Sequence, residues 1–379
     1  MKLCNKLQFK KTILNRKKHI FVAVTNDIST DQRVHKISSY LVEKGFDVLV
    51  YGRVLQTTFS VKRNYTIKRK KHFFNHNFLF YAEYNFRLFF KLLFYKCDYI
   101  LANDLDTLPA CFVASKLKKT ELIYDSHELF SEGPELQGRN FVKGFWRFLE
   151  RIFLPRIKKA FTVSQSIADY YNRKYNANFG VVKNVPILKR EITKVEAKFP
   201  TDNKTVLYQG VLNPGRGIKP MIKALHFLKD IDLVIIGYGK VETELREFVK
   251  AELLENRVHF LGRIPHEELP NYTKLATIGM VLEEPLGLSF EYSLPNKLFD
   301  YIHAGLPIIS GHLPEIKKVI EAYKVGVVVE DYDPKTIAKK IQELIDNEAL
   351  YYQIKLNQQK VKKGFCWENE QQLLDNYFY

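Results

Sequence analysis

The chain alternates between short apolar runs and amphipathic segments. Residues 19–25 (HIFVAVT) and 46–52 (FDVLVYG) are short apolar runs, which are typical of buried strands. Between them lies a polar loop and then an amphipathic segment in which Ile37, Tyr40 and Leu41 share one helical face. A strand, helix and strand of this length predict a βαβ unit and therefore a parallel sheet.

The same alternation recurs along the chain in two series. The first series ends near residue 187, and a mixed, charged stretch without periodicity follows at 188–203. We therefore predict an α/β protein with a first domain at 1–187, a linker at 188–203 and a second domain at 204–355. A helical tail, 356–379, is expected to pack back toward the first domain. A chain of 379 residues is long enough for two cores of this kind.

The loop after the first predicted strand contains no glycine. Asn26, Asp27, Asp31, Gln32 and Arg33 occupy it instead, so the G-x-G-x-x-G fingerprint of dinucleotide-binding domains is absent there. This argues against an NAD- or FAD-binding enzyme.

Cysteine usage and the N-terminal residues indicate the compartment. The four cysteines are scattered without C-x-x-C spacing, which argues against a disulfide framework or a zinc site. No signal peptide is apparent, because the first twenty residues hold seven Lys or Arg, no acid and no long apolar run. We expect a cytoplasmic protein.

The formal net charge is +17, and aromatic residues make up 14% of the chain. This balance suits an anionic partner such as nucleic acid, an acidic lipid surface or a phosphorylated substrate. The alternative is a Lys-rich surface that serves solubility. No helix-turn-helix, zinc finger or RNP-like signature is present, so nucleic acid is not the expected partner.

The segment Asn77–Lys96 is an unusual helix candidate, rich in Phe, Leu and Tyr. Glu83, Arg87 and Lys91 recur every four residues and form one narrow polar stripe. The charges make the segment too polar for a membrane span. One interpretation is a core helix packed on the sheet, which we prefer. The other is a helix whose aromatic flank rests on an anionic membrane, which makes the protein peripheral on the inner membrane face.

Polar residues follow three successive predicted strands of the first domain. They are Asn26 and Asp27, then Asn103 and Asp104, then Asp125, His127 and Glu128. Ligands of open α/β sheets gather at the carboxyl ends of strands. These residues therefore predict one wall of a cleft.

A stretch of the second domain, residues 281–310, predicts an anion site. The SLPNK segment delivers Asn296 and Lys297 to the start of a short helix, and Pro295 suits a helix entrance. Free backbone N–H groups and the positive end of the helix dipole favour an anion such as a phosphate there. Asp300 lies within the first turns of the same helix.

Several stretches together resemble the GT-B glycosyltransferases of the retaining family 4 type, also called glycosyl transferases group 1. In the second domain they are YQGVLNPGRGI, VIIGYG, VHFLGRIPHEELPNYTKLATIGMVL and SLPNKLFDYIHAGLPIIS. In the first they are NDISTDQRVHKISSYLVEKGFDVLVYG, NDLDTLPACFVASKL and IYDSHELF. The resemblance implies two Rossmann-like domains facing a cleft, with the acceptor on the first and the nucleotide-sugar on the second.

The resemblance assigns roles to residues of the second domain. Arg216 matches the cation that family members direct at the donor diphosphate, and Lys297 matches a residue near the same phosphates. A guanidinium after a glycine turn suits phosphate oxygens, although either cation is otherwise an ordinary surface residue. Asp300 falls where the family has the second acid of its E-x7-E motif, which binds the ribose hydroxyls. Val211 stands where a second cation is common. The other residues expected at the nucleotide are Gly210, Gly237 and Asn296.

The first acid of the motif is missing. Counting back from Asp300, its position holds Tyr292. Glu283 and Glu291 have the E-x7-E spacing, but alignment to SLPNK and AGLPII places the register at Asp300, so we treat that pair as a decoy. Any of the three glutamates in this loop has the reach for the donor sugar, and Glu284 and Tyr292 are our candidates for that contact.

The resemblance also bears on the first domain. His127 matches a histidine that lies by the donor sugar or the reaction centre, whereas the residues alone indicate an ordinary strand-end histidine. Asn103 occupies a place often held by His. Asp27 and Asp104 are candidates for the acceptor side, with the alternative that they cap the helices that follow.

The resemblance implies transfer of a sugar from a UDP- or GDP-linked donor to a saccharide hydroxyl with retention, in surface polysaccharide or glycoconjugate synthesis. His127, Arg216 and Lys297 are the expected catalytic residues, and no metal or further cofactor is expected. The net charge and the Asn77–Lys96 helix favour a lipid-linked acceptor. The alternative is another GT-B enzyme, such as a sugar-nucleotide epimerase; for a phosphorylase no pyridoxal-binding lysine is identifiable.

Overall fold

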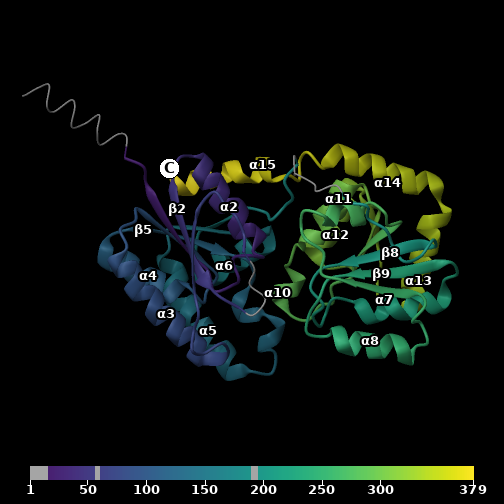
Figure 1. Ribbon diagram of the computed structural model, residues 1–379, viewed down its shortest axis with the longest axis horizontal. Coiled ribbons are helices and arrows are strands. Elements are labelled where there is room, and N and C mark those ends of the chain that lie inside the picture. The colour runs from purple at the N-terminus through teal and green to yellow at the C-terminus, as the bar shows by residue number, and fades with distance from the viewer. Residues whose placement is uncertain (1–15, 56–59, 189–194) are drawn as a thin grey trace, which may run out of the picture.

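A computed structural model describes residues 16–55, 60–188 and 195–379 of the chain. Residues 1–15 of the predicted first domain and 189–194 of the predicted linker lie outside the described residues. The chain forms two α/β domains that lie side by side (Figure 1). The predicted fold class, two Rossmann-like domains in the GT-B arrangement, is confirmed.

The first domain is built on a parallel sheet of seven strands in the order β3-β2-β1-β4-β5-β6-β7. The strands are β1 (His19–Ala23), β2 (Asp47–Arg53), β3 (Thr66–Lys70), β4 (Tyr99–Asn103), β5 (Glu121–Ser126), β6 (Lys159–Thr162) and β7 (Phe179–Val181). The apolar pattern predicts the central strands but not β3. That strand reads TIKRK and alternates between exposed and half-buried residues at the sheet edge, so it lacks an apolar run.

Helices cover both faces of the first sheet. On one face lie α3 (Asn77–Phe94), α4 (Leu108–Lys118), α5 (Asn140–Phe153) and α6 (Gln165–Tyr175), whose apolar residues share one core with the sheet. The other face is covered by α2 (Gln32–Glu43) and by the C-terminal segment. In Figure 1, α3, α4 and α5 lie next to one another on the outer side of this domain.

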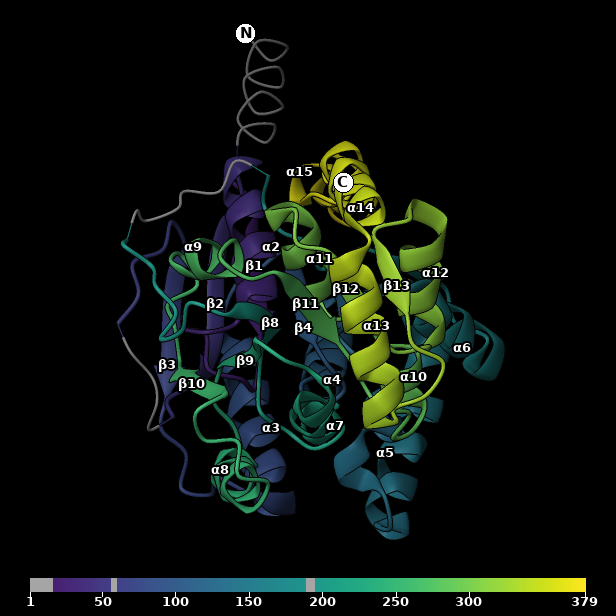
Figure 2. The same ribbon diagram turned by 90° about the vertical axis from the view of Figure 1, so that its right-hand side faces the viewer.

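The second domain contains a parallel six-stranded sheet in the order β10-β9-β8-β11-β12-β13. Its strands are β8 (Lys204–Gln209), β9 (Ile231–Ile236), β10 (Val258–Gly262), β11 (Ile278–Val281), β12 (Ile308–Ser310) and β13 (Gly326–Val328). Helices α7 (Ile218–Ala224), α8 (Glu242–Ala251) and α13 (Pro334–Asp346) pack on one face. Helices α9 (Leu269–Thr273), α11 (Asn296–Ala304) and α12 (Pro314–Tyr323) pack on the other (Figure 2).

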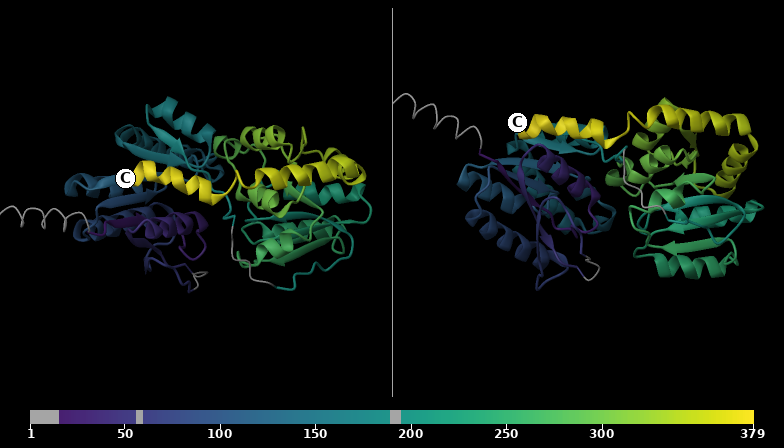
Figure 3. Two further views of the ribbon diagram at one scale, coloured as in Figure 1. Left: turned by 90° about the horizontal axis from the view of Figure 1, so that it is seen from above. Right: turned by 45° about the horizontal axis from the view of Figure 1, so that its top comes forward.

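The C-terminal segment connects the two domains. Helix α14 (Glu348–Val361) packs on the second domain, so the predicted tail boundary at 356 falls inside it, and the chain crosses over after residue 361. The short helices α15 (Trp367–Glu370) and α16 (Asp375–Phe378) then lie on the first domain (Figure 3). Tyr40 of α2 and Lys44, the C-cap residue of that helix, donate to the Asp375 carboxylate at 2.6 and 2.8 Å.

A second connection runs through the short helix α10 (Leu288–Glu291) of the second domain. It contacts the turn η1 (Phe130–Glu132) of the first domain. Within the part of the chain that the structure describes, no helix is both long enough and apolar enough to cross a membrane.

Candidate functional site

The cleft between the domains begins where β8 and β9 end. Gly210 follows β8 with φ +139°, and Gly237 follows β9 with φ +144°. A Cβ atom on Gly237 would lie 1.8 Å from the carbonyl oxygen of Gly210, so a side chain there is sterically excluded. These two predicted site residues therefore hold two strand-end loops against each other at the edge of the cleft.

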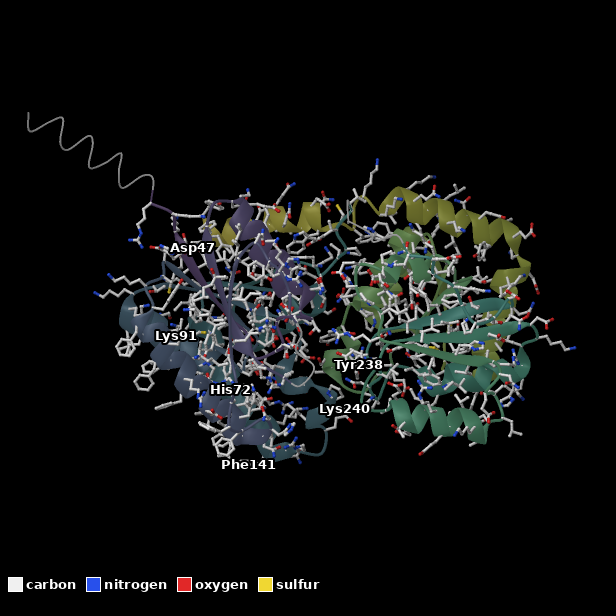
Figure 4. All side chains as sticks on the ribbon, in the orientation of Figure 1. Asp47, His72, Lys91, Phe141, Tyr238 and Lys240 are labelled. Atoms are coloured by element: carbon white, nitrogen blue, oxygen red, sulfur yellow. The ribbon has the colours of Figure 1, made fainter. Side chains whose placement is uncertain are left out.

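Two adjoining cavities occupy the cleft, and residues of both domains line each of them. One, of about 680 Å³, lies between Ser29, Thr30 and Gln32 of the first domain and Gly210, Gly237 and Tyr238 of the second. Tyr238, labelled in Figure 4, lies on the side of the second domain that faces the first. The other cavity, of about 440 Å³, is lined by α2 residues and by Asn296 and Asp300. Gln32, His266 and Glu267 line both.

Asp300 lies on the wall of the second cavity and is held there by hydrogen bonds. Gln209, at the end of β8, donates from Nε2 to Asp300 Oδ2 at 3.1 Å. Thr273 in turn donates to Gln209 Oε1 at 2.8 Å, which fixes the orientation of the amide. An oriented carboxylate in a cavity is an acceptor for ligand hydroxyl groups.

The two predicted cations of the donor site meet at a carboxylate. Lys297 Nζ lies 2.8 Å from Glu283 Oε1, and Arg216 Nη1 lies 3.5 Å from the same oxygen. Glu283 is fully buried, and the Lys297 ammonium also lies over the ring of Tyr208 at 4.0 Å. Lys297 lies beside Gly210 of the cavity wall, because a Cβ there would be 3.7 Å from Lys297 Cε.

This cluster carries a net positive charge. Two cations share one carboxylate, and the buried Nε of Arg216 has no hydrogen-bond partner among the residues that the structure describes. The Arg216 side chain is 26% exposed, and its guanidinium stacks over Phe290 at 4.7 Å. The cluster is therefore suited to bind an anion from the solvent side, with Arg216 as the more accessible cation.

Sequence reasoning did not find the position of Glu283 between the two cations. The motif register directed attention away from it, because Glu283 belongs to the spacing that we treated as a decoy. The sequence feature that could have identified Glu283 is its place two residues after the end of the buried strand β11. The carboxylate contacts Lys297 and Arg216 in this structure.

The two residues expected at the donor sugar, Glu284 and Tyr292, line neither cavity, and their role at the sugar stays a prediction. Glu284 Oε1 accepts from the backbone N–H of Gly217 at 3.2 Å, so it holds the turn that carries Arg216. Tyr292 lies between the domains, where its carbonyl accepts from Ser164 Oγ at 2.7 Å and its ring contacts Tyr170. Tyr292 does not line either cavity described above.

On the first domain, His127 follows β5 and lies between two carboxylates. Its Nδ1 is 3.2 Å from Asp104 Oδ2, and its Nε2 is 3.2 Å from Asp125 Oδ2. Arg33 of α2 binds Asp125 through two hydrogen bonds of 2.8 and 2.7 Å. Ser289 of α10 contacts the neighbouring Glu128 at 3.4 Å, so this loop faces the second domain.

The carboxylates hold His127 in its charged form. Burial on its own lowers the pKa of His127, but Asp104 and Asp125 outweigh it and raise the pKa to about 10. For Asp125, burial raises the pKa while Arg33 and His127 lower it, and the net shift is downward. Burial raises the pKa of Asp104 above its usual value. His127 is therefore an imidazolium at neutral pH, a hydrogen-bond donor and not a base.

The remaining acceptor-side candidates hold the loops in place. Asp27 Oδ1 accepts from the backbone N–H and the hydroxyl of Ser29 at 2.9 and 2.6 Å. Asn103 is buried and donates from Nδ2 to the carbonyl of Ala23 at 3.0 Å, which ties β4 to β1. The alternative that Asp27 and Asp104 cap the following helices is wrong. The N-cap positions of α2 and α4 are held by Asp31 and Thr107.

Two family models match the chain, one on each domain. The Glycosyltransferase Family 4 model matches residues 31–185, and the Glycosyl transferases group 1 model matches residues 189–361. The chain belongs to the group 1, family 4 glycosyltransferases. The resemblance inferred from the sequence motifs is thereby confirmed.

Curated relatives of this glycosyltransferase match over part of their length. An uncharacterized glycosyltransferase of Haemophilus influenzae is 25% identical over 205 residues, which are 52% of this chain and 54% of the relative. The amylovoran biosynthesis glycosyltransferase AmsK of Erwinia amylovora is 27% identical over 251 residues, 62% of this chain and 59% of AmsK. The chain spans about half the length of these curated relatives.

Solved structures match the glycosyltransferase over its whole described fold. Sucrose-phosphate synthase from Thermosynechococcus elongatus has a TM-score of 0.80 at 16% identity, with 96% of this chain and 98% of that chain covered. Anabaena HepE, solved with UDP and glucose, has a TM-score of 0.74 at 15% identity. The match covers 96% of this chain and 99% of the HepE chain. At these identities the likeness establishes the fold.

One further buried acid of this glycosyltransferase was missed at the sequence level. Asp106 lies below Asp104, and Thr25 donates to its Oδ2 at 2.6 Å. Burial, together with the charge of Asp104, raises the pKa of Asp106 to about 7. Thr25 and Asp106 follow two different strands, so only the folded sheet brings them together.

Proposed function

We propose that the protein transfers a sugar from a nucleotide-diphosphate sugar to a carbohydrate hydroxyl, with retention of anomeric configuration and without a metal or other cofactor. The observation that carries this proposal is the convergence of Arg216 and Lys297 on one carboxylate next to Gly210, which lines one cavity, while Asp300, on the same helix as Lys297, lines the adjoining one. Two fixed cations next to an oriented carboxylate match a ligand that joins a diphosphate to a ribose.

Each part of the site has a role in this proposal. Asp300 accepts hydrogen bonds from the ribose hydroxyls, while Arg216, Lys297 and the N-terminus of α11 receive the diphosphate. As the bond to the sugar breaks, negative charge grows on the leaving diphosphate. Preorganised donors of this kind are often the largest catalytic contribution, about 2.7–4 kcal/mol for one donor.

The charged state of His127 supports a route in which the departing phosphate, and not the histidine, takes the proton of the acceptor hydroxyl. Because the pKa of His127 is raised to about 10, its imidazolium has no free base position at neutral pH. The departing phosphate then takes the proton of the acceptor hydroxyl, on the same face of the sugar that the leaving group departs from. Both ring N–H groups of His127 face Asp104 and Asp125, so in this proposal His127 contributes positive charge at the domain boundary.

We propose a UDP-sugar as the donor and a lipid-linked saccharide as the acceptor. HepE has been solved with UDP and with UDP-glucose, which supports a UDP-sugar as donor, with GDP-linked sugars as the alternative. The acceptor in our proposal is a saccharide linked to a lipid at the inner face of the membrane. The protein is placed there as a peripheral cytoplasmic enzyme of surface polysaccharide or glycoconjugate synthesis, which the name of AmsK supports.

A thermal-shift panel of UDP-, GDP- and ADP-sugars tests the donor. A bound donor stabilises by mass action, by about 2.7 kcal/mol at a hundredfold excess over Kd. We expect one nucleotide class to raise the melting temperature in wild type and not in Arg216→Ala. If no sugar nucleotide stabilises the protein at millimolar concentration, the proposal fails. Incubation of the stabilising donor without any acceptor separates transfer from epimerisation, because an epimerase converts the donor sugar on its own.

A further inference from the structure

The outer side of helix α3 carries an exposed stripe of phenylalanines. Phe78, Phe86, Phe90 and Phe94 are 65%, 64%, 41% and 82% exposed. The buried stripe of the same helix, Phe80, Tyr84, Leu88 and Leu92, is offset from them by two residues. At 3.6 residues per turn this offset is about 200°, so the two stripes lie on opposite sides of the helix. The core interpretation therefore holds for one side of α3 and leaves the other side uncovered.

Helix α5 continues this surface. Phe141, Phe145 and Phe148 are 90%, 37% and 55% exposed, and the rings of Phe145 and Phe78 lie 6.1 Å apart. Figure 4 shows the ring of Phe141 projecting away from the ribbon at the end of the first domain. We call these exposed Phe residues of α3 and α5 the aromatic face. An exposed apolar patch of this kind marks a site of interaction with a protein or a membrane.

A basic pocket adjoins the aromatic face. Its volume is about 540 Å³, and four cations line it: Arg147, Arg151, Arg173 and Lys174. Among the described residues no acid lines the pocket, although the neighbouring Glu132 pairs with Arg147 at 2.7 Å and with Lys174 at 3.8 Å. Arg147 and Arg151 come from α5, so this one helix carries both the Phe residues and the entrance of the pocket.

The charge around the aromatic face indicates the partner. Glu83 and Glu150 are the acids of α3, α4 and α5; Glu83 pairs with Arg87 at 2.8 Å, and Glu150 is buried. Lysines and arginines of the same helices remain at the surface, in a chain of net charge +17. A second copy of this face repels the first, because both are basic. An apolar surface edged by cations is complementary to an anionic bilayer.

We propose that the aromatic face docks on a bilayer of anionic phospholipid, with the Phe side chains of α5 at the acyl boundary and the basic pocket at the level of the phosphate headgroups. Through Arg147 and Glu132, α5 is tied to the loop that carries His127. Docking there brings the acceptor side of the cleft next to the membrane. The inference rests on the proposed function only in placing the acceptor at a membrane.

Vesicle sedimentation with the full chain tests the proposal. We compare neutral phosphatidylcholine vesicles with vesicles containing phosphatidylglycerol, at low and at high salt. Wild type is expected to sediment with the anionic vesicles at low salt and to be released by high salt, because salt screens exposed charges. The triple variant F141S/F145S/F148S and the double variant R151E/R173E are each expected to lose about tenfold or more of this binding.

Control variants on the second domain carry changes of the same kind, from exposed apolar to Ser and from a cation to Glu. The variant F227S/L253S removes apolar side chains that are 52% and 85% exposed, and Lys339→Glu reverses an exposed charge. Both are expected to sediment as wild type does. Donor-induced thermal stabilisation is measured on every variant, so that loss of folding or of donor binding is distinguished from loss of lipid binding.

Three results overturn the proposal. One is sedimentation of the triple variant equal to wild type. Another is equal binding to neutral and anionic vesicles at low salt. The third is a wild-type dimer that the triple variant converts to a monomer, because the aromatic face is then an interface between two copies. None of these results tests the donor site, because donor binding is measured separately by thermal stabilisation.

Discussion

Lys297 directs its ammonium group at the fully buried carboxylate of Glu283, with 2.8 Å between Nζ and Oε1. Lys297 begins the first turn of α11, and Glu283 follows β11, so the ion pair joins two elements at the edge of the cleft. A buried ion pair adds little net stability, because desolvation of both charges offsets their attraction. The ion pair instead fixes the position of the Lys297 ammonium group and therefore of the anion site.

Breaking this pair on one side is expected to destabilise the fold. Glu283→Gln keeps the shape but leaves a buried ammonium with a neutral partner, so we expect a loss of about 3–5 kcal/mol in the free energy of unfolding. The double variant E283Q/K297M removes both charges and is expected to recover most of that loss. Denaturant unfolding of the three proteins measures it. If Glu283→Gln is as stable as wild type, Glu283 and Lys297 do not form a buried ion pair that contributes to stability.

Arg216 is expected to act on turnover and not on folding. Its side chain is 26% exposed, so Arg216→Ala is expected to leave the core intact. Loss of one preorganised donor to the leaving diphosphate is expected to lower kcat about 10²–10³-fold. Lys219→Ala, an exposed lysine of the following helix, is the matched control. The measurement is sugar transfer alongside thermal unfolding, and near-wild-type transfer by Arg216→Ala contradicts the assigned role.

Asp300 is expected to bind the hydroxyl groups of the ribose. A hydrogen bond to a charged group contributes about 1.5–3 kcal/mol, so Asp300→Asn is expected to weaken binding of UDP, or of the nucleotide that the panel selects, about tenfold or more. Calorimetric titration with that nucleotide and with its 2′-deoxy analogue measures the effect. Wild type is expected to prefer the ribonucleotide and the variant to lose the preference. Asp346→Asn, at an exposed carboxylate, is the control. An unchanged preference in Asp300→Asn means that another residue reads the ribose.

Most of the fold was predictable because its strands are apolar runs at regular intervals. β1 and β8, for example, are buried over nearly their whole length. The edge strand β3 was not predictable by this signal, because its exposed positions carry Lys and Thr. Helix α3 was predictable as a helix, but periodicity alone does not decide which of its two aromatic stripes faces the sheet.

The candidate site residues were predictable where a local sequence motif specifies the residue type. Contacts between residues that are distant in the sequence were not predictable, because they depend on the fold. Arg216, Lys297 and Asp300 follow from local motifs, although their roles stay predictions. The approach of Glu283 to both cations depends on the path of a loop, and the pairing of Arg33 with Asp125 joins residues 92 positions apart. Neither of these two contacts can be predicted from the spacing of the residues along the chain.

The imidazolium of His127 is expected to make stability depend on pH in the alkaline range. Its pKa is raised from 6.5 to about 10 in the folded protein, so its contribution is fully present below pH 6.5 and is lost as the pH rises through 10. The buried Asp106, with its pKa raised to about 7, adds a loss in the same direction at lower pH, between about 4 and 7. Comparison with His127→Asn separates the histidine at the alkaline end of this range; Asp106 titrates in both proteins, although the charge of His127 lowers its pKa in wild type. We expect the unfolding free energy of wild type to fall by an amount on the order of a few kcal/mol between pH 6.5 and 10, and that of the variant to stay nearly level in this window. Parallel curves for the two proteins show that His127 is not charged by Asp104 and Asp125, and the proton assignment to the leaving phosphate then loses its basis.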